Sequence, residues 1–426
     1  MPVVRPFRAL RYDQSVAGPI ANLIAPPYDV ISPARQDELL ARDPRNVIRV
    51  ELPPSEPGEE PDAQYRRAAR TLAEWRSDGT LRKDPRASLY VYEESYCPPG
   101  DASPRTQRGI FARLRLEPFG PDSGVRRHER TLSGPKEDRY KLLRATGTNT
   151  SPVVGLFDDP TGRVTAFVER IVAGPPDVDA TDDDGVGHRL WAVAESADPE
   201  VTGVAGAIGI GPITIADGHH RYETALRYRD ERRMTRSCEE DPAFDYVLAL
   251  LLEASQPLTI LPTHRIVRGL SADEQRSLRG RLPELFTVRD KAVSGVEPGP
   301  PGEGLFGFVA ADGSALLEAR REAFEPLIAA VPSPVRGLDV TLLGIALEHL
   351  LGIGPEQVAA GRIAYTHDAG EASAAVANEA DVAFLLPPTP VRAVIDVAAA
   401  GEVMPQKSTY FYPKAVTGLV LNPHEW

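Results

Sequence analysis

Residues 213–226 read Ile-Thr-Ile-Ala-Asp-Gly-His-His-Arg-Tyr-Glu-Thr-Ala-Leu, and the rest of the chain is best understood from this stretch. Its first three residues are apolar or β-branched, which predicts a short buried strand. Gly218 allows the backbone to turn sharply where a side chain would clash. From Arg221 onward the apolar residues recur with helical spacing, and the charged residues fall largely on the other face. The stretch therefore predicts a strand, a tight turn and a helix.

The polar residues of this stretch lie where the predicted strand ends and the helix begins. The first N–H groups of a helix have no partner within the helix, and the helix dipole is positive there, so the position favours an anion such as phosphate. We expect Asp217 to hold Mg²⁺ or to orient a hydroxyl group. The residues expected to surround the phosphate are Gly218, His219, His220 and Arg221. An ordinary strand–helix joint with a surface histidine pair is the alternative.

Composition limits the classes of protein that the chain can represent. Its 426 residues suffice for two domains, or for one large α/β unit with an appendage. The formal net charge of −13 argues against a surface that binds nucleic acid phosphates, so we expect no nucleic-acid partner. Two cysteines, Cys97 and Cys238, cannot form a disulfide framework or a four-sulfur zinc site. No apolar run suits a membrane helix and the first residues lack a signal-peptide core, so we expect a cytoplasmic protein without a membrane partner.

The hydrophobic pattern predicts an α/β (α+β) fold with a mixed sheet. Strand candidates are short apolar runs bounded by turn residues, at 47–52, 87–94, 109–116, 188–193, 244–253 and 258–267, the last continuing the same sheet. Helices are predicted at 32–42, 65–76, 272–282 and 338–351. The acidic loop 177–184 is expected to be a disordered tip. After residue 270 the sequence changes to shorter amphipathic segments joined by Gly- and Pro-rich loops. This change predicts a core at 1–270 and an additional α/β C-terminal region at 271–426.

A second polar cluster spans residues 125–143. Glu129 is a natural general base, with His128 alongside, because a carboxylate can deprotonate an attacking hydroxyl group. Lys136 and Arg139 follow a Gly-Pro break on a predicted helix and are candidate anion clamps. A solvated charged face is the alternative explanation of such a run.

Two proline-rich segments complete the candidate site. Tyr28 and Asp29 follow two prolines on a rigid loop, which is either a buried turn or the wall of a substrate pocket. The tail at 404–414 is rigid and aromatic, and we expect it to return to the site. It carries Lys407 as a further anion clamp and Ser408 as a candidate substrate contact.

Several standard motifs are absent from the sequence: the Gly-x-x-x-x-Gly-Lys-Ser/Thr phosphate loop, Gly-x-Gly-x-x-Gly after a strand, His-Glu-x-x-His and Gly-x-Ser-x-Gly. Adjacent histidines point in different directions, so we do not expect His219 and His220 to bind one zinc ion.

Six short motifs together resemble domain-of-unknown-function family number 1015. They are Pro6-Phe-Arg-Ala9, Ala25-Pro-Pro-Tyr-Asp-Val30, His128-Glu-x-Thr131, Gly134-Pro-Lys136, Ala216-Asp-Gly-His-His-Arg-Tyr222 and Met404-Pro-Gln-Lys-Ser408. These matches run over nearly the whole chain, but the family name carries no activity. The Asp-Gly-His-His-Arg core is also similar to the ParB/sulfiredoxin-like fold, including its free serine kinase branch. That second resemblance implies that this loop binds nucleotide phosphate and that an upstream glutamate, here Glu129, is the base.

The departures from these relatives narrow the expected activity. Sulfiredoxin needs a cysteine where this chain has His219, and the Gly-Glu-Arg-Arg motif of ParB proteins is missing. We therefore expect a small-molecule kinase with a ParB/sulfiredoxin-like nucleotide-binding core. It would use ATP or ADP with Mg²⁺ and phosphorylate a small hydroxyl substrate, with free serine as the best candidate. A non-catalytic nucleotide sensor and a phosphatase or phosphodiesterase are the alternatives, and the sequence leaves the oligomeric state open.

Overall fold

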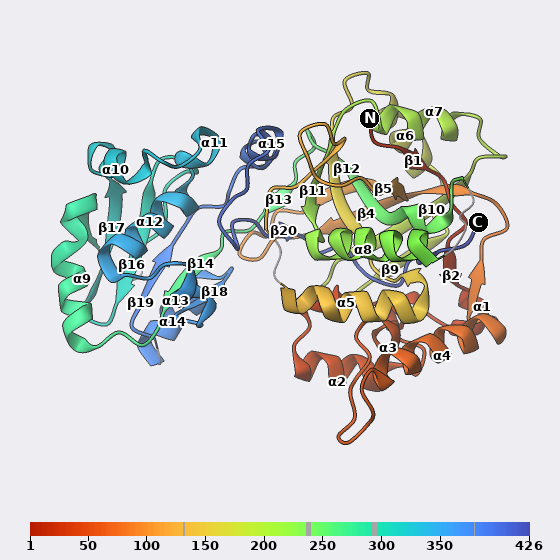
Figure 1. Cartoon of the computed structure of the whole chain (residues 1–426), viewed down its shortest axis with the longest axis horizontal. Coiled ribbons are helices and arrows are strands. Elements are labelled where there is room, and N and C mark those ends of the chain that lie inside the picture. The colour runs from red at the N-terminus through yellow and green to blue at the C-terminus, as the bar shows by residue number, and fades with distance from the viewer. Residues whose placement is uncertain (131–132, 236–239, 292–295, 379) are drawn as a thin grey trace. The chain divides into compact units, whose positions relative to one another are not determined.

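The computed structural model describes residues 1–426 except 131–132, 236–239, 292–295 and 379 (Figure 1). Thr131 of the motif His128-Glu-x-Thr131 and Cys238 therefore lie outside the described residues. The chain forms two compact units. Unit 1 comprises Met1–Arg127, Thr131–Leu258 and Pro413–Trp426, and unit 2 comprises His128–Arg130 and Thr259–Tyr412. The division into domains at 1–270 and 271–426 stays a prediction.

Unit 1 is built on a large mixed sheet. Across the described residues the strand order is β6 (Val125–Arg126), β11 (Ile213–Asp217), β8 (Val153–Phe157), β12 (Tyr246–Glu253), β5 (Arg105–Arg115), β4 (Ser88–Tyr96), β10 (Gly187–Ala194) and β9 (Val178–Thr181), with β1 (Val4–Arg5) also beside β5. β11 runs parallel to β6 and β12 parallel to β8, whereas the other neighbours are antiparallel. The predicted mixed α/β class is confirmed.

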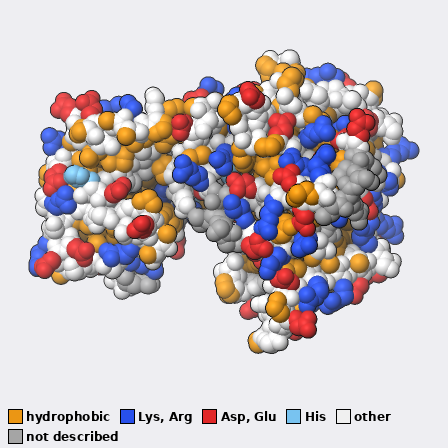
Figure 2. Space-filling view, viewed as in Figure 1, with side chains coloured by type: hydrophobic (Ala, Val, Ile, Leu, Met, Phe, Trp, Pro, Cys, Tyr) orange, Lys and Arg blue, Asp and Glu red, His pale blue; other side chains and the backbone are white. Residues whose placement is uncertain are grey.

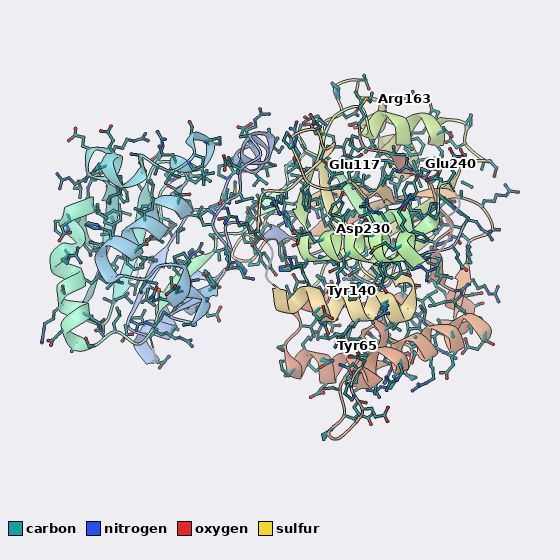
Figure 3. All side chains as sticks on the ribbon, in the orientation of Figure 1. Tyr65, Glu117, Tyr140, Arg163, Asp230 and Glu240 are labelled. Carbon is teal, nitrogen blue, oxygen red and sulfur yellow. The ribbon has the colours of Figure 1, made fainter. Side chains whose placement is uncertain are left out.

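Helices cover this sheet in successive layers (Figure 1). α8 (His219–Thr235) packs against β8 and β12, α5 (Ser133–Thr146) packs against α8, and α4 (Ala63–Ser77) packs against α5. Tyr65, which is labelled in Figure 3, belongs to α4 and donates a hydrogen bond of 2.7 Å to Asp138 of α5. α6 (Arg163–Val172) and α7 (Glu200–Ile208) pack against each other and against β4. The joint between β11 and α8 therefore lies beside α5.

Shorter elements complete unit 1. They are β2 (Leu10–Tyr12), α1 (Gln14–Ala17), 3-10 turns at Ile20–Asn22, Tyr28–Val30 and Ala243–Asp245, α2 (Pro33–Arg42), α3 (Ile48–Glu51), β3 (Leu81–Lys83), β7 (Thr148–Asn149) and β21 (Asn422–Pro423). α2 begins where predicted, because the Ser32 hydroxyl accepts a hydrogen bond from the main-chain N–H of Arg35. β21 pairs with β7 and so attaches the segment 413–426 to unit 1.

Two local predictions in unit 1 are wrong. The run 47–52 is not a strand but contains the helical turn α3. The Asn46 side chain accepts a hydrogen bond of 2.9 Å from the N–H of Ile48, the first residue of this turn. A short apolar run suits a buried helical turn as well as a strand. The acidic loop is not a disordered tip: β9 within it pairs antiparallel with β10, and Val178 is buried.

Unit 2 is built on an antiparallel sheet. Across the described residues its order is β15 (Phe286–Lys291), β17 (Gly313–Ala319), β16 (Leu305–Ala310), β19 (Val382–Leu385), β14 (His264–Val267) and β18 (Ile363–Thr366). The expectation that 258–267 continues the first sheet is wrong, since β14 lies in this second sheet. The chain leaves unit 1 just before β13 (Thr259–Ile260), which pairs with β20 (Phe411–Tyr412).

The helices of unit 2 form one core with α9 (Ala272–Leu285), α10 (Arg321–Ile328) and α12 (Asp339–Leu351), and a smaller one with α14 (Ala369–Asn378). The remaining helices are α11 (Ser333–Arg336), α13 (Pro355–Ala359) and α15 (Val391–Ala399). The predicted helices at 272–282 and 338–351 are confirmed. Over the described residues of both units, no helix combines the length and the apolar character that crossing a membrane requires.

Candidate functional site

The turn between β11 and α8 depends on a glycine. β11 ends at Asp217, Gly218 has φ +87°, and α8 begins at His219. This φ lies in the left-handed region that residues with a side chain rarely adopt. A Cβ added to Gly218 would also lie 3.1 Å from Nε of Arg221. The Arg221 side chain therefore folds back over the glycine.

Asp217 lies between two cations. One carboxylate oxygen accepts a hydrogen bond from Arg221 (2.7 Å) and the other from Nζ of Lys414 (2.9 Å). Burial alone would raise the pKa of Asp217, but the Lys414 ammonium and the Arg221 guanidinium outweigh it and hold this pKa well below its usual range. The Asp217 carboxylate therefore faces two positively charged side chains.

Arg221 is 8% exposed, and its guanidinium is only partly hydrogen-bonded. Besides Asp217, it donates to the main-chain carbonyl of Pro152, the residue before β8. Its Nε is buried and has no hydrogen-bond partner among the described residues. An unsatisfied donor at a helix start is a position where an anion would bind favourably.

The predicted pocket residue Tyr28 also belongs to this cluster. The Arg139 guanidinium lies over the Tyr28 ring at 4.1 Å. Burial raises the pKa of Tyr28 to about 12, while the positive charge of Arg221 opposes this shift. The exposed carboxylate of Asp29 favours the charged forms of His220 and Arg221. The loop at 28–29 therefore lies beside the start of α8.

Glu51 is a member of the cluster that the sequence reasoning missed. Its carboxylate is fully buried and accepts hydrogen bonds from Thr150 and from Ser151 (2.9 Å). Arg139 approaches the same carboxylate at 3.5 Å and donates to the main-chain oxygen of Glu51 at 2.6 Å. A small cavity of about 30 Å³ lies beside these residues. The polar residues that line it include Arg139, Thr150, Ser151, Arg221 and Thr224.

The predicted anion clamps on α5 have carboxylate partners. Nζ of Lys136 lies 2.9 Å from Glu223 of α8, which also pairs with Arg127 at 3.3 Å. Arg139 pairs with Asp138 and with Glu51. Burial lowers the pKa of His220, which Glu223 opposes and Lys136 reinforces. These residues form a network of paired charges around the start of α8.

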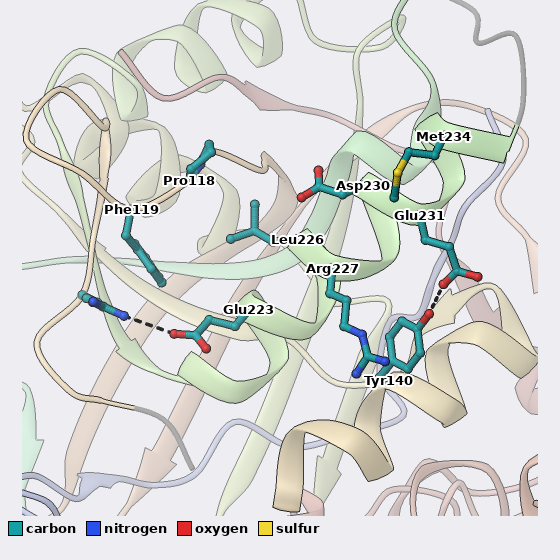
Figure 4. Close-up of a pocket in the computed structure, with 10 residues that line it drawn as sticks. Pro118, Phe119, Tyr140, Glu223, Leu226, Arg227, Asp230, Glu231 and Met234 are labelled. Carbon is teal, nitrogen blue, oxygen red and sulfur yellow. Dashed lines mark hydrogen bonds and ion pairs between the residues drawn. The ribbon is translucent and has the colours of Figure 1, made fainter. Parts of the chain in front are cut away.

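An open groove of about 680 Å³ runs along the outer face of α8 (Figure 4). Glu223 contributes to it, and Arg227 lies over the Tyr140 ring at 3.6 Å. Basic and acidic side chains are mixed over the face of the molecule that Figure 2 shows. The groove is therefore lined by paired charges of both signs, with apolar side chains such as Leu226 between them.

The other predicted site residues belong to unit 2. His128 is buried, and its Nε2 lies 3.1 Å from Oγ1 of Thr409. Glu129 follows it in the same segment. Lys407 is exposed with φ +56°, and Ser408 is buried with its hydroxyl donating to Pro405 at 2.5 Å. Unit 1 therefore brings together the predicted residues of the loop at 28–29, α5 and the start of α8, and unit 2 holds the rest.

The residues around Asp217 do not fit a magnesium ion. Both carboxylate oxygens already accept hydrogen bonds from Arg221 and Lys414, and two adjacent positive charges disfavour a divalent cation. Among the described residues, no group of three or more His, Cys, Asp or Glu side chains could hold a metal ion. Magnesium on Asp217 stays a prediction, and no step is derived from it.

A family model described as protein of unknown function (DUF1015) matches residues 4–341. The chain belongs to this family. None of the curated proteins compared matches the chain.

Solved structures show distant likenesses. A conserved hypothetical protein from Pyrococcus furiosus has 14% identity and a TM-score of 0.35, covering 71% of this chain and 90% of its own. Free serine kinase in complex with AMP has 14% identity and a TM-score of 0.38, covering 73% and 91%. SbnI from Staphylococcus aureus, with a C-terminal truncation, has 11% identity and a TM-score of 0.37, covering 72% and 87%.

Proposed function

We propose that the start of α8 binds the phosphates of a nucleotide and that the protein transfers phosphate from ATP or ADP to a small hydroxyl substrate. Free serine is the best candidate substrate, because the motif Asp217–Arg221 resembles the phosphate-binding loop of the free serine kinase branch of the ParB/sulfiredoxin-like fold. The ParB/sulfiredoxin-like character of the core is part of this proposal.

The observation that carries the proposal is the charge balance at Asp217. Arg221 and Lys414 share this one carboxylate, and the buried Nε of Arg221 has no partner among the described residues. A phosphate oxygen would supply an acceptor for this nitrogen and a further negative charge beside the two cations. The Gly218 turn places the beginning of α8 at the same point, and the N-terminal end of a helix favours an anion.

The proposed reaction is an in-line phosphoryl transfer. The substrate hydroxyl oxygen forms a bond to the terminal phosphorus, the bond from that phosphorus to the bridging oxygen breaks, and the electron pair stays on the departing nucleotide. ATP would yield ADP, and ADP would yield AMP. Arg221 and Lys414 would stabilise the negative charge on the transferred group. Glu129 is proposed to accept the hydroxyl proton as general base.

A non-catalytic nucleotide sensor is the second candidate. The observation that favours it is that Asp217, Glu51 and Glu223 all have cationic or hydroxyl partners, which suits binding better than proton transfer. A phosphatase or phosphodiesterase would use the same phosphate site with water as the acceptor.

Calorimetry with ADP and ATP tests the phosphate site. Arg221→Ala should weaken nucleotide binding by about 1.5–3 kcal/mol, the contribution of a charge-assisted hydrogen bond. Arg66→Ala is the matched control, because Arg66 is exposed on α4 and its partners among the described residues, Glu60 and the carbonyl of Pro61, lie at the surface. Equal affinity in Arg221→Ala and wild type would remove the phosphate site from this position.

Phosphorus NMR separates the enzyme from the sensor. Purified protein is incubated with ATP or ADP, Mg²⁺ and an amino-acid mixture. A new phosphomonoester signal that requires serine supports the kinase, and free phosphate alone supports the phosphatase. Binding without any new signal over a broad panel of acceptors supports the sensor.

A further inference from the structure

A second cavity, of about 310 Å³, lies in unit 1 between α6 and the large sheet. Its walls come from β5, β8, α6, β12 and the turn after β12: Thr106, Arg108, Gly109, Phe157, Val164, Thr165, Val168, Glu169, Leu251, Glu253, Gln256 and Pro257. Phe157 ends β8, whereas Pro152, the partner of Arg221, precedes it. The cavity is therefore at the opposite end of β8 from the proposed phosphate site, roughly 16 Å away at the usual rise of a strand.

The inner wall of this cavity is apolar. Phe157, Val164, Val168 and Leu251 are all buried side chains of the unit 1 core. A cavity of this volume and lining suits the hydrocarbon part of a small ligand.

Most polar groups around the cavity, other than its two carboxylates, are already hydrogen-bonded within the protein. The Gln256 amide accepts from the N–H of Arg108 (2.8 Å) and donates to its carbonyl (2.9 Å). The Arg108 guanidinium donates to Glu93 at 2.7 Å. The Thr165 hydroxyl donates to Asp159 at 3.0 Å. The cation at the rim is therefore neutralised, and these groups offer little to an anion.

Two carboxylates at the rim keep free acceptor capacity. One oxygen of Glu253 accepts from the N–H of Ser255 (2.9 Å) and of Gln256 (3.1 Å), and its other oxygen has no partner among the described residues. Glu169 is exposed on α6, and within the described part of the chain it makes no hydrogen bond or ion pair. The groups left for a ligand are negatively charged acceptors above an apolar wall.

We propose that this cavity binds a small organic cation with an apolar body, of the arylalkyl ammonium class. The ammonium group would lie against Glu253 and Glu169, and the hydrocarbon would pack on Val164, Val168 and Leu251. This site is separate from the proposed phosphate site and does not depend on it.

The probes that test the proposal are 2-phenylethylammonium, 2-phenylethanol and phenylacetate, which share one apolar body and differ in charge. Saturation-transfer NMR on the full chain should give a Kd for the cation on the order of 1 mM, as expected for so small a ligand. The alcohol should bind about tenfold more weakly, and the anion more weakly still, because hydrogen bonds to charged groups are the stronger ones.

Two variants link binding to the cavity. Thr165→Trp places a large ring at the cavity mouth from an exposed position on α6, and should abolish binding of the cation. Glu169→Gln with Glu253→Gln should remove the preference for the cation over the alcohol. Glu356→Gln, at an exposed position in α13, is the matched control and should leave both affinities unchanged.

Three results would overturn the proposal. They are equal binding of the three probes, unchanged affinity in a folded Thr165→Trp protein, and no saturable binding of the cation up to about 10 mM. Thermal unfolding of each variant shows whether it is folded, and the Glu169→Gln single variant serves as the fallback if Glu253→Gln unfolds.

Discussion

The proposed site residues of unit 1 and those of unit 2 are held by different interactions. In unit 1, Asp217 is bound by the side chains of Arg221 and Lys414, and all three are largely removed from solvent. In unit 2, the backbone of Lys407 is held instead: its carbonyl accepts a hydrogen bond of 3.0 Å from buried Arg265, while its own side chain is exposed. Side-chain ion pairs fix charges in place, whereas a main-chain hydrogen bond fixes a loop and leaves its charge in water.

The buried charges of the two units are compensated to different extents. Buried charges need compensation, because desolvation costs more than a lone interaction returns. Asp217 is overcompensated by its two cations. Arg265 has no carboxylate within ion-pair distance in the described part of the chain, and burial lowers its pKa to about 10. Substitutions in unit 1 therefore test ion pairs between side chains, and substitutions in unit 2 test hydrogen bonds to the main chain.

The largest expected effect is on turnover. Glu129→Gln, in unit 2, should retain nucleotide binding and lose turnover by roughly 10²–10⁴-fold, because the amide cannot accept the hydroxyl proton. Stopped assays of phosphate transfer, with calorimetry on the same protein, measure the two quantities. Glu74→Gln, at an exposed position of α4 in unit 1, is a control of the same chemistry. Wild-type turnover in Glu129→Gln would exclude it as the base and would confine the chemistry to other residues.

The next effect is on the stability of unit 1. Glu51→Ala should lower the free energy of unfolding by about 3 kcal/mol, because it leaves Arg139 and two hydroxyl groups without their buried partner. Glu51→Gln keeps acceptors for the hydroxyl groups and should cost less. The tryptophans Trp75, Trp191 and Trp426 all belong to unit 1, so their fluorescence during urea unfolding reports on this unit. Exposed Glu56→Ala is the control, and a change below about 0.5 kcal/mol in Glu51→Ala would contradict the prediction.

Glu94 is a buried carboxylate that makes no ion pair with a Lys or Arg among the described residues, and its pKa shifts in the opposite direction to that of Asp217. Glu94 accepts hydrogen bonds from Tyr92 (3.0 Å) and Gln107, and burial raises its pKa to about 7, although His188 opposes the shift. The folded protein therefore binds this proton more tightly than the unfolded chain, where the pKa is 4.5.

The sign of the resulting pH dependence follows from linkage. The stability contributed by protonated Glu94 is present below pH 4.5 and is lost as the pH rises to about 7, by roughly 2–3 kcal/mol. Glu94→Gln should remove this part of the pH dependence, measured as urea unfolding from pH 4.5 to 8. An identical pH profile in Glu94→Gln and wild type would show that another group is responsible.

The smallest effect concerns the main-chain contact in unit 2. Arg265→Met should loosen the segment at Lys407 and speed its hydrogen exchange about 5–30-fold, the factor that one or two kcal/mol produces. Exchange mass spectrometry of peptides covering 404–410 measures it. Exposed Arg276→Met in α9 is the control. Unchanged exchange in Arg265→Met would mean that other contacts hold this loop.

Some residues of the candidate site could be identified from the sequence, and others could not. Asp217, Gly218 and Arg221 lie within one motif, so their types and spacing pointed to a helix start that binds anions. Glu51 lies in an ordinary apolar run, and its role comes from Thr150 and Ser151, which are 99 and 100 residues away. Glu223 could have been noticed, since it lies one turn after His219 on the same helix. Lys414 was part of the predicted tail, but nothing in the sequence identified its partner.

The sequence by itself determined the local structure of this protein: the strand, glycine turn and helix at 213–235, the strands β4 and β5, and the helix that begins after Ser32. These depend on backbone dihedrals and on side-chain periodicity over a few residues. The tertiary structure decided which charges meet, such as Asp217 with Lys414, 197 residues apart. It also decided which unit each strand joins and which proposed residues each unit holds. An ion pair or a buried charge exists only where folding removes water and brings distant groups within a few ångströms, and no local pattern records that distance.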